Sequence, residues 1–155
     1  MSLLLNTTKI INEWTDYNNH MNLSFYILVF DKAAEKILSK FNMGEEAAIK
    51  TKRSTMVVET HTTYNNEVKE GDEVEINLTF FDHDKKRLHF KMEMIEKSSK
   101  KLSATLESLS LYIDLNRRKV TEFENEKIKI MDEFISKNNS TFKNDNLKFS
   151  SKLKK

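Results

Sequence analysis

The spacing of apolar side chains changes its period along this chain, and each period predicts a different element. From Leu23 to Phe41 the apolar residues recur at steps of three and four, the pattern of one buried helix face. Ser24 is suited to cap the first turn, and Gly44 is placed to end the segment. We therefore predict one long helix that lies across a sheet through a single stripe: Tyr26, Phe30, Ala33, Ala34, Ile37, Leu38 and Phe41.

Beyond Lys52 the apolar positions alternate with polar ones, as they do in half-buried strands. Four such segments follow at residues 56–64, 74–80, 88–94 and 102–115, and residues 82–86 are typical of a hairpin turn. We also predict a first strand at residues 3–14 and a short helix at 126–135. This order predicts an α+β domain in which an antiparallel sheet packs against one main helix.

Length and composition set the broad class of this protein. The chain has 155 residues, of which 38% are hydrophobic and 32% charged, as expected for one soluble domain with a charged surface. We predict that residues 1–135 form this domain. Residues 136–155, with six lysines and one aspartate, should form a flexible basic tail. The tail lacks regularly interleaved aromatic residues, so we interpret it as solubilising and expect no nucleic-acid partner.

The sequence also excludes several classes of site. Because the chain has no cysteine, disulfides, a cysteine nucleophile and thiolate metal sites are ruled out. It has no glycine-rich phosphate loop, serine-centred elbow or zinc motif. His83 lies between two aspartates, and we interpret it as a solvated turn residue rather than a metal ligand; His89 falls on the polar side of its strand. Without a bilayer-length apolar run or a secretion signal, we expect a cytoplasmic protein with no membrane partner.

The segment before the predicted helix carries candidate chemistry. Asp16, Asn18 and His20 are spaced two residues apart, so in an extended or turning chain their side chains point the same way. They would share a small volume at the helix N-terminus, where free N–H groups and the helix dipole favour a developing negative charge. The alternative is that they only form turns and cap the helix. Glu67, in a turn after Tyr64, would by itself be interpreted as a solvent-facing side chain.

Two sequence blocks resemble a known family. They are EWTDYNNHMNLSFYILVFDKA, which begins at Glu13, and ETHTTYNNEVKEGDEVEINLTFFDHDKKRLHF, which begins at Glu59. Both are similar to blocks of the hotdog-fold acyl-CoA thioesterases, in particular the 4-hydroxybenzoyl-CoA thioesterase-like group with its D-Y-N-G-H-M-N signature. The resemblance runs from Leu5 to Phe123, and it departs from the signature at Asn19, where the group has glycine.

This resemblance implies a hotdog fold, in which a curved antiparallel sheet of about five strands wraps one long central helix. It also implies a homodimer or a dimer of dimers with the acyl-CoA site at the subunit interface. Plant acyl-ACP thioesterases of this fold carry an Asp-x-Asn-x-His constellation and a later glutamate, which match Asp16, Asn18, His20 and Glu67. The bacterial hydroxybenzoyl-CoA branch instead uses an aspartate, which aligns with Asp16 or with the position held by Asn18.

The implied function is hydrolysis of an acyl-CoA to the free acid and CoA, with no metal and no cofactor beyond the CoA of the substrate. Glu67 would act as general base on a water or as a nucleophile. Asn18 and His20 would position the water or polarise the carbonyl, and Asp16 would orient His20 or the loop. The alternative is a non-catalytic hotdog module that binds acyl-CoA as a sensor or partner-binding unit.

The acyl pocket should be lined by apolar residues from the helix, such as Tyr26 and Phe30, with strand residues opposite. We expect a short- or medium-chain acyl group, and a betainyl group is the second possibility, since an aromatic cage binds quaternary ammonium. Trp14 would join such a cage. The expected substrate-binding residues are Tyr17, Tyr26, Phe30 and Tyr64.

Overall fold

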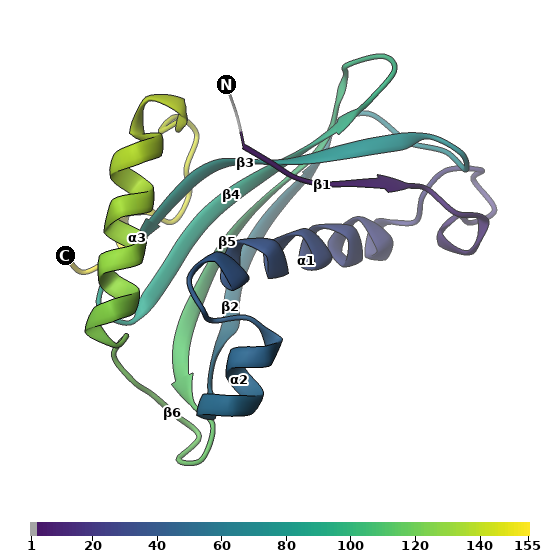
Figure 1. Ribbon diagram of the computed structural model, residues 1–155. Coiled ribbons are helices and arrows are strands. Elements are labelled where there is room, and N and C mark those ends of the chain that lie inside the picture. The colour runs from purple at the N-terminus through teal and green to yellow at the C-terminus, as the bar shows by residue number, and fades with distance from the viewer. Residues whose placement is uncertain (1–2) are drawn as a thin grey trace.

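The structure, a computed structural model, describes residues 3–155 and consists of one curled sheet, a long helix and two shorter helices (Figure 1). Three 3-10 turns, at Asn12–Trp14, Asn139–Thr141 and Ser150–Lys152, complete the secondary structure. The helices are α1 (Leu23–Lys40), α2 (Glu45–Thr51) and α3 (Asn125–Asn138). The strands are β1 (Leu3–Lys9), β2 (Arg53–Tyr64), β3 (Glu73–His83), β4 (Arg87–Glu96), β5 (Leu102–Asp114) and β6 (Lys119–Val120).

The sheet is antiparallel throughout and has the strand order β1-β3-β4-β5-β2, with β6 paired to β5. It curls around α1, as Figure 1 shows. The predicted α+β class and the hotdog arrangement of a curved sheet around one main helix are therefore confirmed. In this order β2 and β1 are the two outer strands of the main path, so β2 has one edge without a partner in the part of the chain that is described.

Helix α1 forms where the apolar stripe predicts it, because that stripe fills the inside of the curled sheet. Phe30, Ala33 and Ile37 of the stripe are each 0% exposed. Two end signals were misassigned. Asn22 caps the helix instead of Ser24: its Oδ1 accepts the backbone N–H of Ser24 at 3.0 Å and the Ser24 hydroxyl at 2.6 Å.

The second misassigned signal is Gly44, which does not end α1. The helix stops at Lys40, and Gly44 is the N-cap of α2. Glu35 and Ser39 approach Gly44 so closely that a side chain there would collide with them. Helix α2 was not predicted, since its seven residues are too few to show a clear period.

Strands β2, β3 and β4 reach further than the alternation alone indicated, β5 ends one residue before the predicted position 115, and the first strand is shorter than expected. β1 stops at Lys9 and is followed by the 3-10 turn at Asn12–Trp14, where one continuous strand was expected. β3 extends through His83, so the hairpin turn occupies residues 84–86 only.

No helix within residues 3–155 has the length and apolar character that a bilayer crossing requires.

Two histidines that we expected at polar positions are buried. His83 is 6% exposed, and its Nε2 lies 2.6 Å from Oδ1 of Asp132 on α3. His89 is 0% exposed, and its Nε2 lies 2.7 Å from Oε1 of Glu107. The interpretation of His83 as a solvated turn residue is therefore wrong. Alternation identifies the two faces of a strand, but it does not tell whether a later segment covers the second face.

His89 is covered by residues 136–155, which we expected to be a flexible tail. The N–H groups of Lys148 and Phe149 donate to the Glu107 carboxylate at 2.8 Å and 2.9 Å, and Phe149 is 4% exposed. Further along, the N–H of Lys154 donates to Oδ2 of Asp84 at 2.8 Å. Lys143 also binds Thr79 on β3 and Glu93 on β4, so the segment makes defined contacts with β3, β4 and β5 and forms the second layer over His89.

Candidate active site

The loop between the 3-10 turn and α1 is held in shape by Asp16. Its Oδ1 accepts the N–H of Asn18 at 2.8 Å, and its Oδ2 accepts the side-chain amide of Asn22 at 3.1 Å. These two hydrogen bonds, the backbone one first, hold the pKa of Asp16 below its ordinary value, so the carboxylate is ionised near neutral pH. Asn19 turns the chain with φ of 62°, the left-handed geometry for which glycine is the usual residue. The Asp16 carboxylate therefore holds the loop in its conformation.

His20 is oriented by its own neighbour. Its Nδ1 lies 3.0 Å from the carbonyl oxygen of Met21. A carbonyl can only accept, so Nδ1 carries the proton, and in the neutral ring Nε2 is left as the acceptor. Met21 is fully buried, and its N–H donates to the carbonyl of Val68 at 2.8 Å. That bond ties the loop to the segment that carries Glu67.

The predicted residues meet at one cavity of about 520 Å³ in front of the N-terminus of α1. Its lining joins the loop, the first turns of α1 and the end of β2. Seven of its residues were predicted from the sequence: Asp16, Tyr17, Asn18, His20, Tyr26, Tyr64 and Glu67. Five were not singled out: Met21, Asn22, Leu23, Asn65 and Asn66. Asn22 could have been found, because an Asx residue directly before an apolar-periodic segment is a cap signal.

Phe30 is the one expected substrate-binding residue that does not line this cavity. It is 0% exposed in the core beneath α1. Position in the apolar stripe cannot separate a core residue from a pocket residue, because both lie on the same helix face. Tyr26, one turn earlier, lines the cavity at 4% exposure.

Two tyrosines form the aromatic part of the lining. The rings of Tyr26 and Tyr64 are 5.2 Å apart between centroids and meet edge to face at 88°. Burial raises the pKa of the Tyr26 hydroxyl above its ordinary value, against the effect of a backbone hydrogen bond from Val68. Tyr64 is 48% exposed and Tyr17 93% exposed, so both present ring surface to an incoming molecule. Trp14 stacks on Phe25 and is not among the lining residues.

Glu67 supplies the second carboxylate of the cavity. Its side chain is 56% exposed, and its Oε1 lies 3.6 Å from Nζ of Lys69. Unlike the Asp16 carboxylate, the Glu67 carboxylate accepts no hydrogen bond from any group within residues 3–155. Its oxygens are therefore available to a water or a substrate. Asn18 and His20 stand on the same cavity. This set can hold and deprotonate a water beside a polarised carbonyl.

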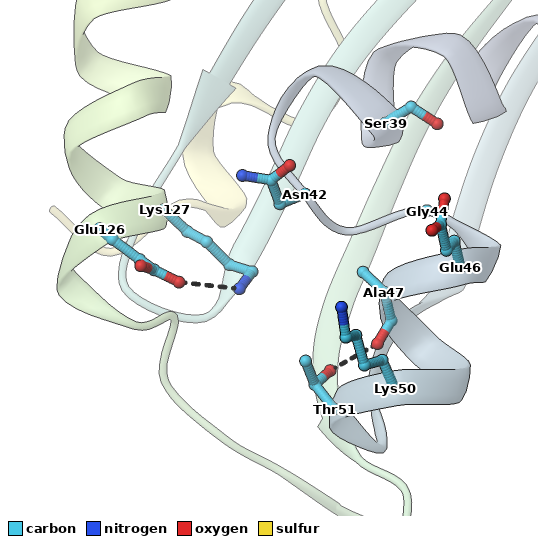
Figure 2. A pocket seen from close by; sticks show the side chains of 9 residues that line it. All are labelled: Ser39, Asn42, Gly44, Glu46, Ala47, Lys50, Thr51, Glu126 and Lys127. Carbon is cyan, nitrogen blue, oxygen red and sulfur yellow. Dashed lines mark hydrogen bonds and ion pairs between the residues drawn. The ribbon is translucent and has the colours of Figure 1, made fainter.

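A second cavity, of about 400 Å³, lies at the opposite end of α1, between α2 and α3 (Figure 2). It is lined by Ser39, Asn42, Gly44, Glu46, Ala47, Lys50, Thr51, Glu126 and Lys127, and none of the predicted site residues is among them. Lys127 lies 3.6 Å from Glu126 there, as Figure 2 shows. Nowhere in residues 3–155 do three His, Cys, Asp or Glu side chains gather in a way that could hold a metal ion.

Comparison with known proteins adds independent information. Residues 12–135 match the thioesterase-like superfamily. The chain is 32% identical over 128 residues to a betainyl-CoA thioesterase of Pseudomonas aeruginosa, covering 81% of this chain and 80% of that protein. It is 30% identical over 112 residues to an L-carnitine dehydrogenase/betainyl-CoA thioesterase of Rhizobium meliloti, of which it spans 22%. A hypothetical protein of Staphylococcus aureus, solved in complex with CoA, superimposes with a TM-score of 0.80 at 21% identity, covering 100% of this chain and 96% of that one.

Proposed function

Since this chain belongs to the thioesterase-like superfamily and is an acyl-CoA thioesterase, we propose that the cavity in front of α1 is where it hydrolyses the thioester. The observation that carries the proposal is the meeting of Asp16, Asn18, His20 and Glu67 at one cavity, although Glu67 lies far along the chain from the loop. The bond from the Met21 N–H to Val68 joins the two segments and supports the same conclusion.

In the proposed mechanism Glu67 is the general base. It takes a proton from a water whose oxygen attacks the thioester carbonyl carbon; the C–S bond then breaks, and the proton passes on to the departing thiolate. Asn18 and Nε2 of His20 hold the water or polarise the carbonyl. The positive end of the α1 dipole, at Leu23 in the cavity lining, faces the developing oxyanion. Asp16, occupied by Asn18 and Asn22, keeps the loop in position.

For the acyl group, we propose a small one, with betainyl as the first candidate. Both relatives named above carry betainyl-CoA thioesterase in their names. The faces of Tyr17 and Tyr64 and the carboxylate of Glu67 would suit a trimethylammonium group, which binds to aromatic faces and to negative charge. The D-Y-N-N-H-M-N segment keeps a hydroxybenzoyl group as the second candidate, and generic short and medium acyl chains as the third.

We also propose that the protein works as a homodimer joined through β2. That strand has a free edge, and the side chains of residues 56–61 are exposed on both of its faces. Val57 and Val58 are 57% and 53% exposed. A long apolar strand edge is normally covered by another chain.

Light scattering should therefore give the mass of a dimer, and Val58→Lys should shift this mass to that of a monomer. Val120 on β6 is 43% exposed and serves as the control, so Val120→Lys should leave the dimer mass unchanged. A cytoplasmic location stays a prediction.

Release of free thiol from a panel of acyl-CoAs tests the function. The panel contains betainyl, hydroxybenzoyl and straight-chain acyl groups from acetyl to palmitoyl, each with Asn18→Ala and Glu67→Gln alongside. Loss of the base should lower turnover by about 10² to 10⁴. Near wild-type turnover in Glu67→Gln would remove its role. Binding of an acyl-CoA without any thiol release would favour the sensor function instead.

A further inference from the structure

Strand β2 contains a bulge that gives its two ends a common orientation. Its register against β5 shifts between Val57 and Glu59. Because of this extra residue, both Arg53 and Tyr64 stand opposite even-numbered residues of β5, Asp114 and Ala104. Both residues therefore lie on the same face of the sheet. It is the face that carries α1, because the Tyr64 ring packs against Tyr26 of that helix. Without the bulge, an odd and an even position would face opposite sides.

A second copy of the chain fits this edge in one simple way. Two identical edges pair about a two-fold axis, so the strands run antiparallel and residues at equal distances on either side of the axis pair with one another. The exposed run 56–61 has its midpoint between Val58 and Glu59. An axis at that midpoint sets Arg53 of the second copy directly opposite Tyr64. Residues opposite one another in an antiparallel pair share a face, with their Cβ atoms about 5 Å apart, and the bulge makes this possible here.

We propose that Arg53 of the second copy completes the active site by binding an anionic oxygen of the substrate. This inference rests on the proposed function, and it adds a residue from the partner to the site. The cavity is lined by the carboxylates of Asp16 and Glu67 and by His20, with no lysine or arginine. Acyl-CoA brings negative charge in its phosphates, and hydrolysis develops more on the carbonyl oxygen. A single cation beside Tyr64 is placed to bind one of these two anionic oxygens.

The Arg53 side chain is held in one orientation by an ion pair within its own chain. Its guanidinium NH1 lies 3.0 Å from Oε1 of Glu124, and its side chain is 35% exposed. The other oxygen of Glu124 is bound by Lys127 at 2.5 Å and by the Tyr112 hydroxyl at 3.2 Å. Tyr112 is 1% exposed, so the carboxylate is anchored to the core. One contact thus fixes the arginine while its remaining N–H groups stay free for a bidentate contact with an oxyanion.

The first experiment compares Arg53→Gln with Arg87→Gln. Arg87 is a matched control, because its NH1 also lies 3.0 Å from a carboxylate, Asp84, and its side chain is 24% exposed. Each variant is assayed with the best acyl-CoA of the panel and with the N-acetylcysteamine thioester of the same acyl group. Arg53→Gln should lose about 10- to 100-fold in kcat/KM with acyl-CoA, the worth of one charge-assisted hydrogen bond, and Arg53→Lys should lose less. Equal behaviour of Arg53→Gln and the control would overturn the proposal.

The two thioesters separate the two sources of negative charge. If Arg53 binds phosphate, the loss appears in KM and only with acyl-CoA. If it binds the carbonyl oxyanion, the loss appears in kcat with both thioesters. Absence of thiol release from the wild-type protein would count against the proposed function alone. Calorimetric binding of CoA to wild type and Arg53→Gln would then decide the inference, with equal affinities refuting it, because a protein that releases no thiol forms no carbonyl oxyanion for Arg53 to bind.

A mixed dimer tests whether the arginine comes from the other copy. Arg53→Gln and Glu67→Gln chains with different tags are co-expressed, and the heterodimer is isolated by both tags. One of its cavities then has an intact Glu67 in its own chain and an intact Arg53 in the second copy. It should show the wild-type KM with about half the wild-type rate. Activity no higher than the mean of the two mutant homodimers would mean that Arg53 acts within its own chain.

Discussion

The buried carboxylate of Glu107 should decide whether residues 136–155 stay on the sheet. It is 1% exposed and receives three donors: Nε2 of His89 at 2.7 Å, the N–H of Lys148 at 2.8 Å and the N–H of Phe149 at 2.9 Å. Burial raises the pKa of Glu107, but the hydrogen bonds from these donors outweigh it and hold the pKa below its ordinary value. The carboxylate is thus ionised beneath the segment.

Replacing Glu107 by alanine leaves these three donors without an acceptor in a site closed to water. Breaking one side of such a buried charged network costs about 3–5 kcal/mol, a large share of the roughly 5–15 kcal/mol that stabilises a domain. Glu107→Gln keeps the shape and one accepting oxygen, so we expect a smaller loss. As a control, Glu93→Gln breaks only the surface pair with Lys143, at 2.9 Å, and should cost under about 1 kcal/mol.

Urea unfolding followed by circular dichroism measures these differences, and trypsin cleavage after Lys148 reports whether the segment detaches. The pKa of Glu107 is lowered from 4.5, so its contribution is complete above that pH and is lost as the pH falls through the folded-state pKa. The stability gap between wild type and Glu107→Gln should therefore be constant near neutral pH and narrow below pH 4.5. An alanine variant within about 0.5 kcal/mol of wild type, with unchanged cleavage, would refute the reasoning.

Three further predictions follow from the site. Asn22→Ala removes the cap of α1 and a hydrogen-bond partner of Asp16. It should lower the free energy of unfolding in urea by about 0.5–2 kcal/mol and also lower kcat. A kcat equal to that of the wild type would mean that the cap does not support the catalytic loop. Phe30→Ala should cost about 3–5 kcal/mol but leave KM unchanged, since Phe30 is core and not pocket; a raised KM would place it at the substrate. Tyr64→Leu should raise KM for betainyl-CoA more than for the isosteric, uncharged 3,3-dimethylbutanoyl-CoA, by about 2- to 30-fold if a cation–π contact is lost; an equal rise for both would mean that only apolar area was lost.

Local sequence patterns predicted most of the elements. The three- and four-residue steps of α1 and the alternation in β2 to β5 come from backbone geometry, which acts over a few residues, and each was found at its predicted place. The errors are at element ends and in short elements, such as α2 and the cap at Asn22. There a single hydrogen bond or a close approach, as at Gly44, outweighs the average preference of a residue type.

For the site, spacing grouped Asp16, Asn18 and His20, and the family resemblance added Glu67. Their meeting at one cavity depends on the bond from Met21 to Val68 and on the pairing of distant strands, which no local pattern contains. Phe30 and Tyr26 occupy the same stripe, but only the position of α1 under the sheet makes one core and the other pocket.

The sequence by itself determined the periods, the class of fold and the chemistry available in front of α1, because these depend on neighbouring residues. Only the tertiary structure decided which polar residues are buried and which strand edge is free. His89 falls on the polar side of its strand, and it is buried because residues 136–155 close over it and over its partner Glu107. Burial is a property of everything that packs on a side chain, including segments far away in the chain, and alternation within one strand carries no information about them.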